Sequence, residues 1–259
     1  SAILMDLMGA PAAEKIALLE PHASNFRRDD LFVELAKAYN QNFQPEKALQ
    51  LLLSHVFVAC EGGEHAIADQ YMYAWFQLGM AKKAAGDWAG CYELLEKALT
   101  LPKSLGSGIW NRCKYVPYQF HMAECLGHMG KKEDAQSIYR MILDIEVEFF
   151  SNMHLRELPY YQALCAEALG LQQKAWNIMA RAKRDWSFNL DRKDNGFFST
   201  TPFFISFAQD PAIARRAYYQ YLLGLVKLYE GDRERAKALF RESYAGNSDS
   251  LFCHYYAHL

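Results

Sequence analysis

The sequence lacks the frequent turn residues that an all-β fold of its size would need. Its 259 residues include only 8 prolines and 15 glycines, and long stretches contain neither. Hydrophobic residues make up 51% of the chain and aromatic residues 14%, a composition that excludes disorder and a coiled coil. The sequence therefore predicts a mostly helical globular protein.

The sequence also lacks an excess of charge of either sign, and it lacks long hydrophobic runs. The chain has 28 Lys and Arg residues against 30 Asp and Glu, a formal net charge of −2. We therefore expect neither nucleic acid nor an anionic membrane surface as the main partner. No window approaches the roughly 20 apolar residues of a membrane span. The 6 cysteines are scattered without a C-x-x-C pair, which indicates reduced thiols and a cytoplasmic protein.

Motifs of catalysis and cofactor binding are missing as well. The sequence contains no G-x-S-x-G, no P-loop, no G-x-G-x-x-G and no H-E-x-x-H. His254 and His258 are four residues apart, as metal ligands on a helix can be, but no Glu lies between or after them. We therefore expect a protein that is not an enzyme and that binds no metal or cofactor.

A spacing of twelve residues between two small side chains recurs five times along the chain. A bulky residue follows sixteen positions after the first small residue, and a glycine follows seven positions after it in four of the five cases. Small residues let two antiparallel helices approach closely, bulky ones fill the gap between them, and the glycine ends the first helix. The pattern predicts five helical hairpins. The small pairs are Ala36 and Ala48, Gly79 and Cys91, Ala123 and Ala135, Ala163 and Ala175, and Gly224 and Ala236; the bulky residues are Leu52, Leu95, Tyr139, Met179 and Phe240; the glycines are Gly86, Gly130, Gly170 and Gly231, with Phe43 as the exception.

The segments that carry this spacing resemble tetratricopeptide repeats. WFQLGMAKKAAGDWAGCYELLEKAL and YLLGLVKLYEGDRERAKALF are two of them, and IALLEPH resembles the second helix of a unit that lacks most of its first. The resemblance implies an all-α, right-handed α-solenoid of about five hairpins plus a truncated first unit, in a single domain over residues 1–259. The first small residues are 43, 44, 40 and 61 positions apart, so long insertions separate the repeats.

The insertions carry a second, narrower resemblance. The order H-x-F-x-x-x-EGGE, LP-x-x-LGSG and GFFSTTPFF is similar to the helical C-terminal region of bacterial proteins that carry the domain of unknown function 5107. That family usually has a Trp before EGGE, where this chain has Ala59 and Cys60. The resemblance implies that the chain is the C-terminal fragment of a longer protein with an upstream β-rich, carbohydrate-associated module.

Two rows of residues on the first helices of the hairpins are predicted to line a groove, because tetratricopeptide arrays present this face on their concave side. The rows lie three residues before and one residue after each first small residue, so they share a helix face. Their content is aromatic and apolar, and only Lys37 fits the basic pattern of arrays that bind a terminal carboxylate. The predicted groove residues are the members of the two rows, Val33, Lys37, Phe76, Met80, Phe120, Glu124, Tyr160, Leu164, Tyr221 and Leu225, together with Tyr73 and Tyr218, which precede Phe76 and Tyr221 by three residues.

Two interpretations of these rows stay open. As an exposed groove, their rings would hold an apolar peptide or stack on sugar rings. Alternatively, the insertions fold back over the rows and bury them as core, since so apolar a stripe is unfavourable in water. If the groove is open, Phe76→Ala with Tyr221→Ala should weaken the capture of a partner and leave the helicity intact.

The loop from Glu61 to Glu64 is a second candidate site. Its two carboxylates, with His55 and His65 beside them, could bind a metal ion or a sugar hydroxyl, and its two glycines would let a ligand approach closely. The alternative, which we favour, is a tight polar loop that caps the next helix and contacts a neighbouring domain.

The sequence thus predicts a non-catalytic interaction scaffold that binds a protein or peptide, or an upstream β-rich domain of its own chain. The competing hypothesis is an accessory domain of a carbohydrate-active enzyme whose loops contribute to an oligosaccharide site, and it rests on the narrower resemblance alone. A homo-oligomer that forms through an end of the solenoid is a third expectation, because an array cut in mid-unit exposes apolar surface.

Overall fold

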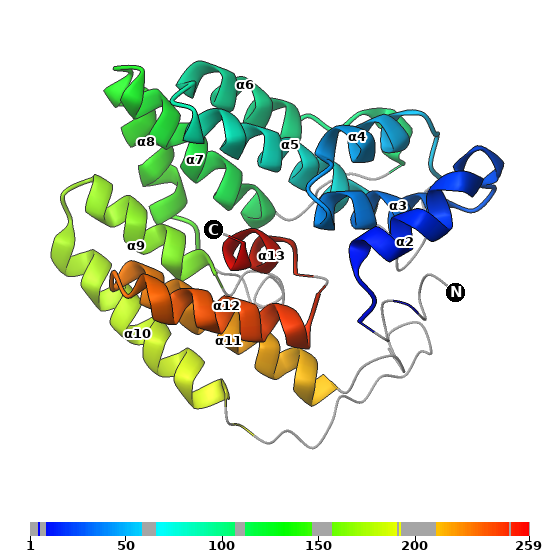
Figure 1. The fold of residues 1–259 in the computed structure, drawn as a ribbon. Coiled ribbons are helices and arrows are strands. Elements are labelled where there is room, and N and C mark those ends of the chain that lie inside the picture. The colour runs from blue at the N-terminus through cyan, green and yellow to red at the C-terminus, as the bar shows by residue number, and fades with distance from the viewer. Residues whose placement is uncertain are drawn as a thin grey trace. The chain divides into compact units, whose positions relative to one another are not determined.

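The structure is a computed structural model that describes residues 5, 9–58, 66–106, 112–146, 157–190, 192, 211–248 and 250–258. The chain forms two compact units, Ser1–Ala135 (unit 1) and Gln136–Leu259 (unit 2). The boundary falls inside one helix, α8 (Lys132–Leu143). The described residues contain helices and no β-strand, so the all-α class is confirmed (Figure 1). None of the described helices combines the length and the apolar character that a bilayer-crossing segment requires.

Unit 1 consists of helices that follow one another in chain order. They are α2 (Ala12–Leu19), η1 (Glu20–Asn25), α3 (Asp29–Gln41), α4 (Pro45–Leu53), α5 (Ala66–Ala84), α6 (Trp88–Ala98), η2 (Lys103–Leu105), η3 (Arg112–Tyr115) and α7 (Val116–His128), where η marks a 3₁₀ helix. Each α-helix from α2 to α6 packs on the next one, as far as α7. This sequential packing is the arrangement that stacked hairpins require.

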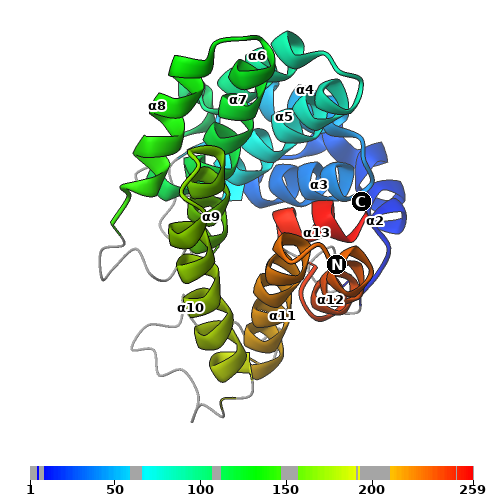
Figure 2. The ribbon, with the colours of Figure 1, turned by 90° about the vertical axis from the view of Figure 1, so that its left-hand side faces the viewer.

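Unit 2 repeats the sequential packing of helices. They are α9 (Leu158–Ala168), α10 (Gln172–Leu190), α11 (Pro211–Tyr229), α12 (Arg233–Gly246) and α13 (Leu251–Ala257). Each of them packs on the next one along the chain, and Figure 2 shows α10 and α11 side by side. The hairpins α9–α10 and α11–α12 correspond to the fourth and fifth predicted units.

The hairpin turns have the geometry that the glycine pattern predicts. Gly86, Gly130, Gly170 and Gly231 have φ between 76° and 81°, the left-handed region that glycine enters without strain. Phe43 takes the same place in the first hairpin at φ 54°. In all five hairpins the next N–H donates to the carbonyl five residues back, at 2.8 to 3.0 Å, which is the bond of a Schellman cap. The first turn therefore keeps this geometry without a glycine.

Capping residues determine where the second helices begin. Asp87 and Asp232 each accept a hydrogen bond from a backbone N–H three residues on, at 2.9 and 3.1 Å. Pro45 occupies the first turn of α4, where its missing N–H has no intrahelical role.

The small residues lie where the helices touch. All ten are buried, and Cys91 serves among them as a small apolar residue with a free thiol. A Cβ atom at Gly224 would lie 2.5 Å from Phe240 Cε1, and one at Gly79 would lie 3.3 Å from Leu95 Cδ2. The bulky residue sixteen positions on thus fills the space beside the small one, as the sequence predicts.

Parts of the predicted insertions extend helices. α5 already begins at Ala66, inside the first insertion, and α10 continues to Leu190, inside the last one. The first two insertions also meet, because the backbone N–H of Phe57 donates to the carbonyl of Ser104 at 2.8 Å. The GFFSTTPFF segment lies outside the described residues.

α13 resumes the repeat after the fifth hairpin. Its Ala257 is buried and lies 33 residues after Gly224, close to the roughly 34 residues of a bare tetratricopeptide unit. α13 packs on α12, and Cys253 Sγ donates to the carbonyl of Phe240 at 3.3 Å. α13 therefore occupies the position of the first helix of a further hairpin, which the sequence analysis did not assign.

Candidate functional site

The predicted groove residues lie mostly inside the two units. Those that are buried are Lys37, Tyr73, Phe76, Met80, Phe120, Tyr160, Tyr221 and Leu225, and those that are half-buried are Val33, Glu124, Leu164 and Tyr218. The buried rings therefore contribute to the packing of the helices. The binding of a partner by these rows stays a prediction.

In unit 1 the rows form a series of ring contacts between α5 and α7. The rings of Tyr73 and Phe76 stack at a centroid distance of 6.2 Å. Phe76 also meets Tyr118 edge-on at 5.5 Å and lies 5.6 Å from the ring of His121. Such contacts stabilise the pair of helices beyond the burial of apolar area. The ring of His121 joins this aromatic series to a polar cluster.

Lys83, His121 and Glu124 form that cluster, which we call the Lys83 cluster. Lys83 Nζ donates to Glu124 Oε2 at 2.6 Å, and His121 Nδ1 lies 2.5 Å from the same oxygen. The three side chains are 24%, 11% and 30% exposed, so the cluster reaches solvent beside the buried rings. It links the first helices of two neighbouring hairpins.

Of the three residues of the Lys83 cluster, only Glu124 was predicted from the sequence. Lys83 lies three residues after Met80 and seven after Phe76, so it shares their helix face. His121 lies three residues before Glu124 on the same helix. A search for polar residues at these offsets from the predicted rows would have found both.

The protonation of the cluster follows from its surroundings. Burial lowers the pKa of His121, and the charge of Lys83 acts in the same direction, so the ring is neutral. Because an ionised carboxylate only accepts hydrogen bonds, the ring proton is on Nδ1 and points to Glu124. Burial favours a raised pKa for Glu124, but the hydrogen bond from His121 and the charge of Lys83 outweigh it and lower this pKa to about 2. His121 Nε2 is a buried acceptor with no hydrogen-bond partner among the described residues.

Replacing Glu124 by glutamine should destabilise the chain at neutral pH and have little effect at low pH. The pKa of Glu124 in the folded state lies below its ordinary value of 4.5. The ionised carboxylate therefore stabilises the fold above about pH 4.5, and this contribution is lost as the pH falls towards 2. We expect Glu124→Gln to lower the free energy of unfolding by about 1–3 kcal/mol at pH 7. Urea titrations followed by circular dichroism at pH 7, 5 and 3 measure it.

Glu93 supplies the matched control, since it is an exposed carboxylate on α6 of the same unit. Glu93→Gln should change the free energy of unfolding by less than about 0.5 kcal/mol at each pH. A difference between wild type and Glu124→Gln that is as large at pH 3 as at pH 7 would contradict the role assigned to Glu124.

In unit 2, α13 covers part of the predicted rows. The Tyr256 ring stacks on Phe240 at 5.0 Å and lies 6.3 Å from the ring of Tyr221. Burial raises the pKa of Tyr221 well above its ordinary value. Nearby, the hydroxyl of Tyr218 donates to Glu157 Oε2 at 2.7 Å. Tyr221 is therefore covered in part by α13, a helix that was not predicted from the sequence.

His55 is the one described member of the predicted loop site. Its Nε2 lies 2.8 Å from Asp29 Oδ1, and the other oxygen of Asp29 accepts the backbone N–H of Val58 at 3.1 Å. The ring also stacks on Phe32 at 4.1 Å. These contacts attach the first insertion to the start of α3. The members outside the described residues are Glu61, Glu64 and His65.

The described residues contain no group of three or more His, Cys, Asp or Glu side chains that could hold a metal ion.

Comparison with known proteins identifies one repeat by sequence. A family model of the tetratricopeptide repeat matches residues 118–145, a segment that contains most of α7 and all of α8. Two crystal structures of nearly identical TPR-like repeats, from a candidate kinesin light chain of Podospora anserina, are similar to the chain at 17% identity. One match covers 84% of this chain and 93% of the other with a TM-score of 0.35, and a substituted form of the same repeats covers 88% and 96% with a TM-score of 0.36.

Proposed function

We propose that the chain is a non-catalytic scaffold that binds a segment of another protein at the Lys83 cluster. The observation that supports this most is a charged pair and an imidazole held in one arrangement across two hairpins and only partly open to water. In such a place hydrogen bonds to a ligand are less weakened by solvent than on an open surface. The tetratricopeptide repeat match agrees with the proposal, because such repeats commonly bind proteins and the fold itself supplies no chemistry.

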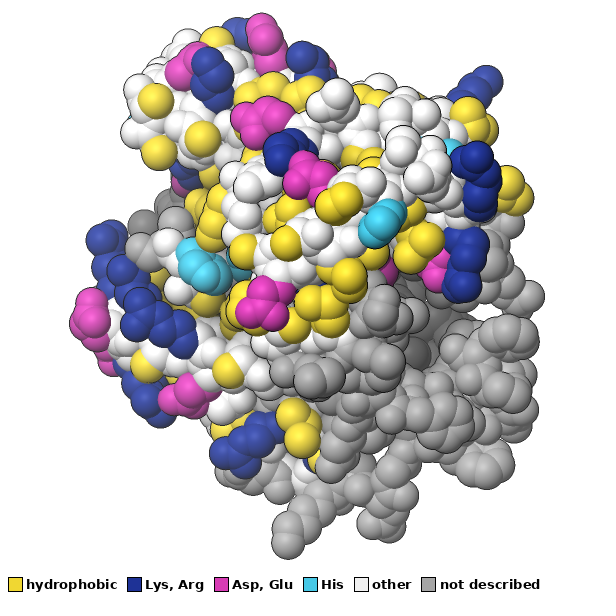
Figure 3. Space-filling model, turned by 45° about the vertical axis from the view of Figure 1, so that its right-hand side comes forward, with side chains coloured by type: hydrophobic (Ala, Val, Ile, Leu, Met, Phe, Trp, Pro, Cys, Tyr) yellow, Lys and Arg dark blue, Asp and Glu magenta, His cyan; other side chains and the backbone are white. Residues whose placement is uncertain are grey.

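The cluster suits a peptide because it offers both kinds of hydrogen-bonding group. Lys83 presents ammonium donors, and Glu124 presents carboxylate acceptors. A peptide backbone has donors and acceptors in alternation, so one segment can satisfy both. Figure 3 shows hydrophobic side chains interspersed with acidic and basic ones over the described part of one face.

The partner in this proposal is a separate protein or an upstream β-rich module of the same chain. The second source follows from the resemblance to the region beside the domain of unknown function 5107, and so does the competing proposal of an oligosaccharide ligand. No described contact favours the sugar. Both ligand classes therefore enter the test.

A peptide library displayed on phage tests the proposal with the full chain as bait. We expect selected peptides to bind the wild type and to lose at least tenfold in affinity for the double variant Lys83→Glu with Glu124→Lys, measured by calorimetry. This exchange keeps an ion pair but reverses the charges that the peptide meets. The matched control is the exchange Arg181→Asp with Asp185→Arg on α10, an exposed pair at 3.9 Å, which should leave the affinity within about twofold.

Peptides that bind the Lys83/Glu124 exchange as tightly as the wild type would place the binding surface elsewhere. A panel of oligosaccharides in a thermal-shift assay completes the test, since a ligand of the folded state raises the melting temperature. A sugar that raises the melting temperature, together with failure to select any peptide, would favour the accessory role in a carbohydrate-active enzyme.

A further inference from the structure

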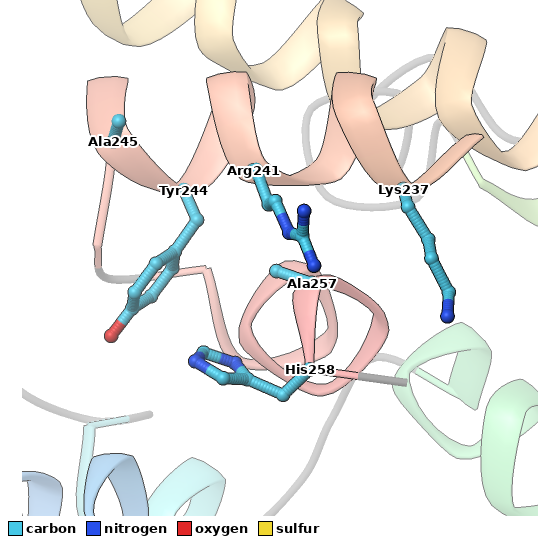
Figure 4. A pocket seen from close by; sticks show the side chains of 6 residues that line it. All are labelled: Lys237, Arg241, Tyr244, Ala245, Ala257 and His258. Atoms are coloured by element: carbon cyan, nitrogen blue, oxygen red, sulfur yellow. The ribbon is translucent and has the colours of Figure 1, made fainter. Parts of the chain in front are cut away.

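Two basic side chains and an imidazole line an open pocket in unit 2, between α12 and α13 (Figure 4). The pocket has a volume of about 400 Å³ and shares no residue with the Lys83 cluster. Its lining residues are Lys237, Arg241, Tyr244, Ala245, Ala257 and His258.

The repeat geometry brings these side chains together. Lys237, Arg241 and Tyr244 follow one another at intervals of four and three residues, so they project from one face of α12. Figure 4 shows all three on the side of α12 that faces α13, with the Arg241 guanidinium next to Ala257. The stacked rings of Phe240 and Tyr256 hold α13 against α12. Both walls of the pocket therefore belong to packed helices.

His258 at the end of α13 is held by its own helix. Its Nδ1 lies 2.8 Å from the carbonyl oxygen of His254, and since a carbonyl only accepts, Nδ1 carries a proton and donates it. The ring of Tyr244 meets that of His258 edge-on at 5.8 Å and that of His254 at 5.3 Å. The imidazole consequently has a defined orientation opposite α12.

The charges of the pocket are unbalanced. No carboxylate lines it, and in the part of the chain that the structure describes neither Lys237 nor Arg241 has an ion-pair or hydrogen-bond partner. Elsewhere on α12, Arg235 lies 4.0 Å from Glu242. Like charges four residues apart on a helix repel each other, and a bound anion would turn this repulsion into attraction.

We propose that this pocket binds a phosphomonoester. Two positive charges match the charge of such a group, which carries about −1.5 to −2 at pH 7, better than they match the single charge of a carboxylate. Arg241 can donate two parallel N–H bonds to phosphate oxygens, and Lys237 adds a point charge. Tyr244, Ala245 and Ala257 give the organic part of the ester an apolar wall.

This site is independent of the proposed peptide site in unit 1. Its phosphoryl group can come from a small molecule or from a phosphorylated peptide, and the experiment separates the two sources.

Calorimetry with the full chain and phenyl phosphate at fixed ionic strength tests the proposal. We expect saturable binding to the wild type and at least a tenfold loss of affinity for Lys237→Met with Arg241→Met, because methionine keeps an unbranched stem without the charge. The control Arg181→Met with Arg184→Met removes two cations from α10 of the same unit and should leave the affinity within about twofold. Far-UV circular dichroism verifies the fold of each variant.

Absence of saturable binding, or an equal loss of affinity in the α10 control, would overturn the proposal. The same holds if Lys237→Met with Arg241→Met binds phenyl phosphate as tightly as the wild type. If phenyl phosphate binds as expected, a short phosphotyrosine peptide then identifies the source of the phosphoryl group. Binding at least tenfold tighter than that of phenyl phosphate assigns the phosphoryl group to a peptide, and equal binding assigns it to a small molecule.

Discussion

Phe76→Ala and Tyr221→Ala are each expected to lower the free energy of unfolding by about 3–5 kcal/mol. Both side chains are only 1% exposed, and each lies among other aromatic rings of its own unit. Alanine would leave a cavity that packed helices cannot fully close. From the sequence alone, the double variant is expected to lose partner capture with intact helicity, and the burial of both rings changes that expectation. Urea unfolding followed by circular dichroism measures the loss.

Trp176→Ala is the matched control, because Trp176 is a large aromatic residue on α10 that is 63% exposed. It should change the free energy of unfolding by less than about 0.5 kcal/mol. If Phe76→Ala and Tyr221→Ala unfold at the same urea concentration as Trp176→Ala, the two rings are not part of the core. An effect on partner capture should therefore be read only from variants that keep the stability of the wild type.

Gly224→Ala is expected to destabilise the chain by about 2–3 kcal/mol, although alanine favours helices more than glycine does. The new Cβ would lie 2.5 Å from Phe240 Cε1 and 2.7 Å from Cδ1. The ring of Phe240 is 2% exposed and stacks on Tyr256, so it has no space to move into. Thermal or urea unfolding reports the difference.

The same substitution at Gly79 is the control. There the new Cβ would lie 3.3 Å from Leu95 Cδ2, the end of a flexible side chain. Gly79→Ala should therefore be close to neutral, because the gain in helix propensity of about 1 kcal/mol offsets a small rearrangement. Adding Phe240→Leu to Gly224→Ala should cost less than the sum of the two single effects. Strictly additive effects would show that the two residues do not meet.

The hairpins could be predicted from the sequence because the contacts that form them are local. The sixteen residues from Gly224 to Phe240 comprise part of α11, the turn and part of α12. The packing of two antiparallel helices in a hairpin determines this spacing. The caps are local too, since the left-handed residue and the bond to the carbonyl five positions back lie within six residues. The spacing of small residues and the position of the turn residue recur in all five hairpins, so they can be recognised in the sequence.

The candidate site was only partly predictable, because its contacts join different hairpins. Lys83 and Glu124 are 41 residues apart, and their approach depends on the offset between α5 and α7. The contact of His55 with Asp29 spans 26 residues and joins the first insertion to the start of α3. The family resemblance assigned Glu124 to the predicted groove rows, but the exposure of a helix face depends on which other helices cover it. Tyr221 is covered by Tyr256, which lies on α13, a helix that follows the fifth hairpin.

Phe43 makes the α3–α4 connection unlike the other four. Its backbone is held at φ 54°, where a side chain other than glycine is disfavoured by about 1–2 kcal/mol. The Schellman bond from Gln44 to Tyr39 and the proline that starts α4 hold the chain there nonetheless. The α3–α4 turn is therefore the only one of the five hairpin turns with a conformationally strained residue at this position. We expect thermal unfolding of the hairpins to begin there.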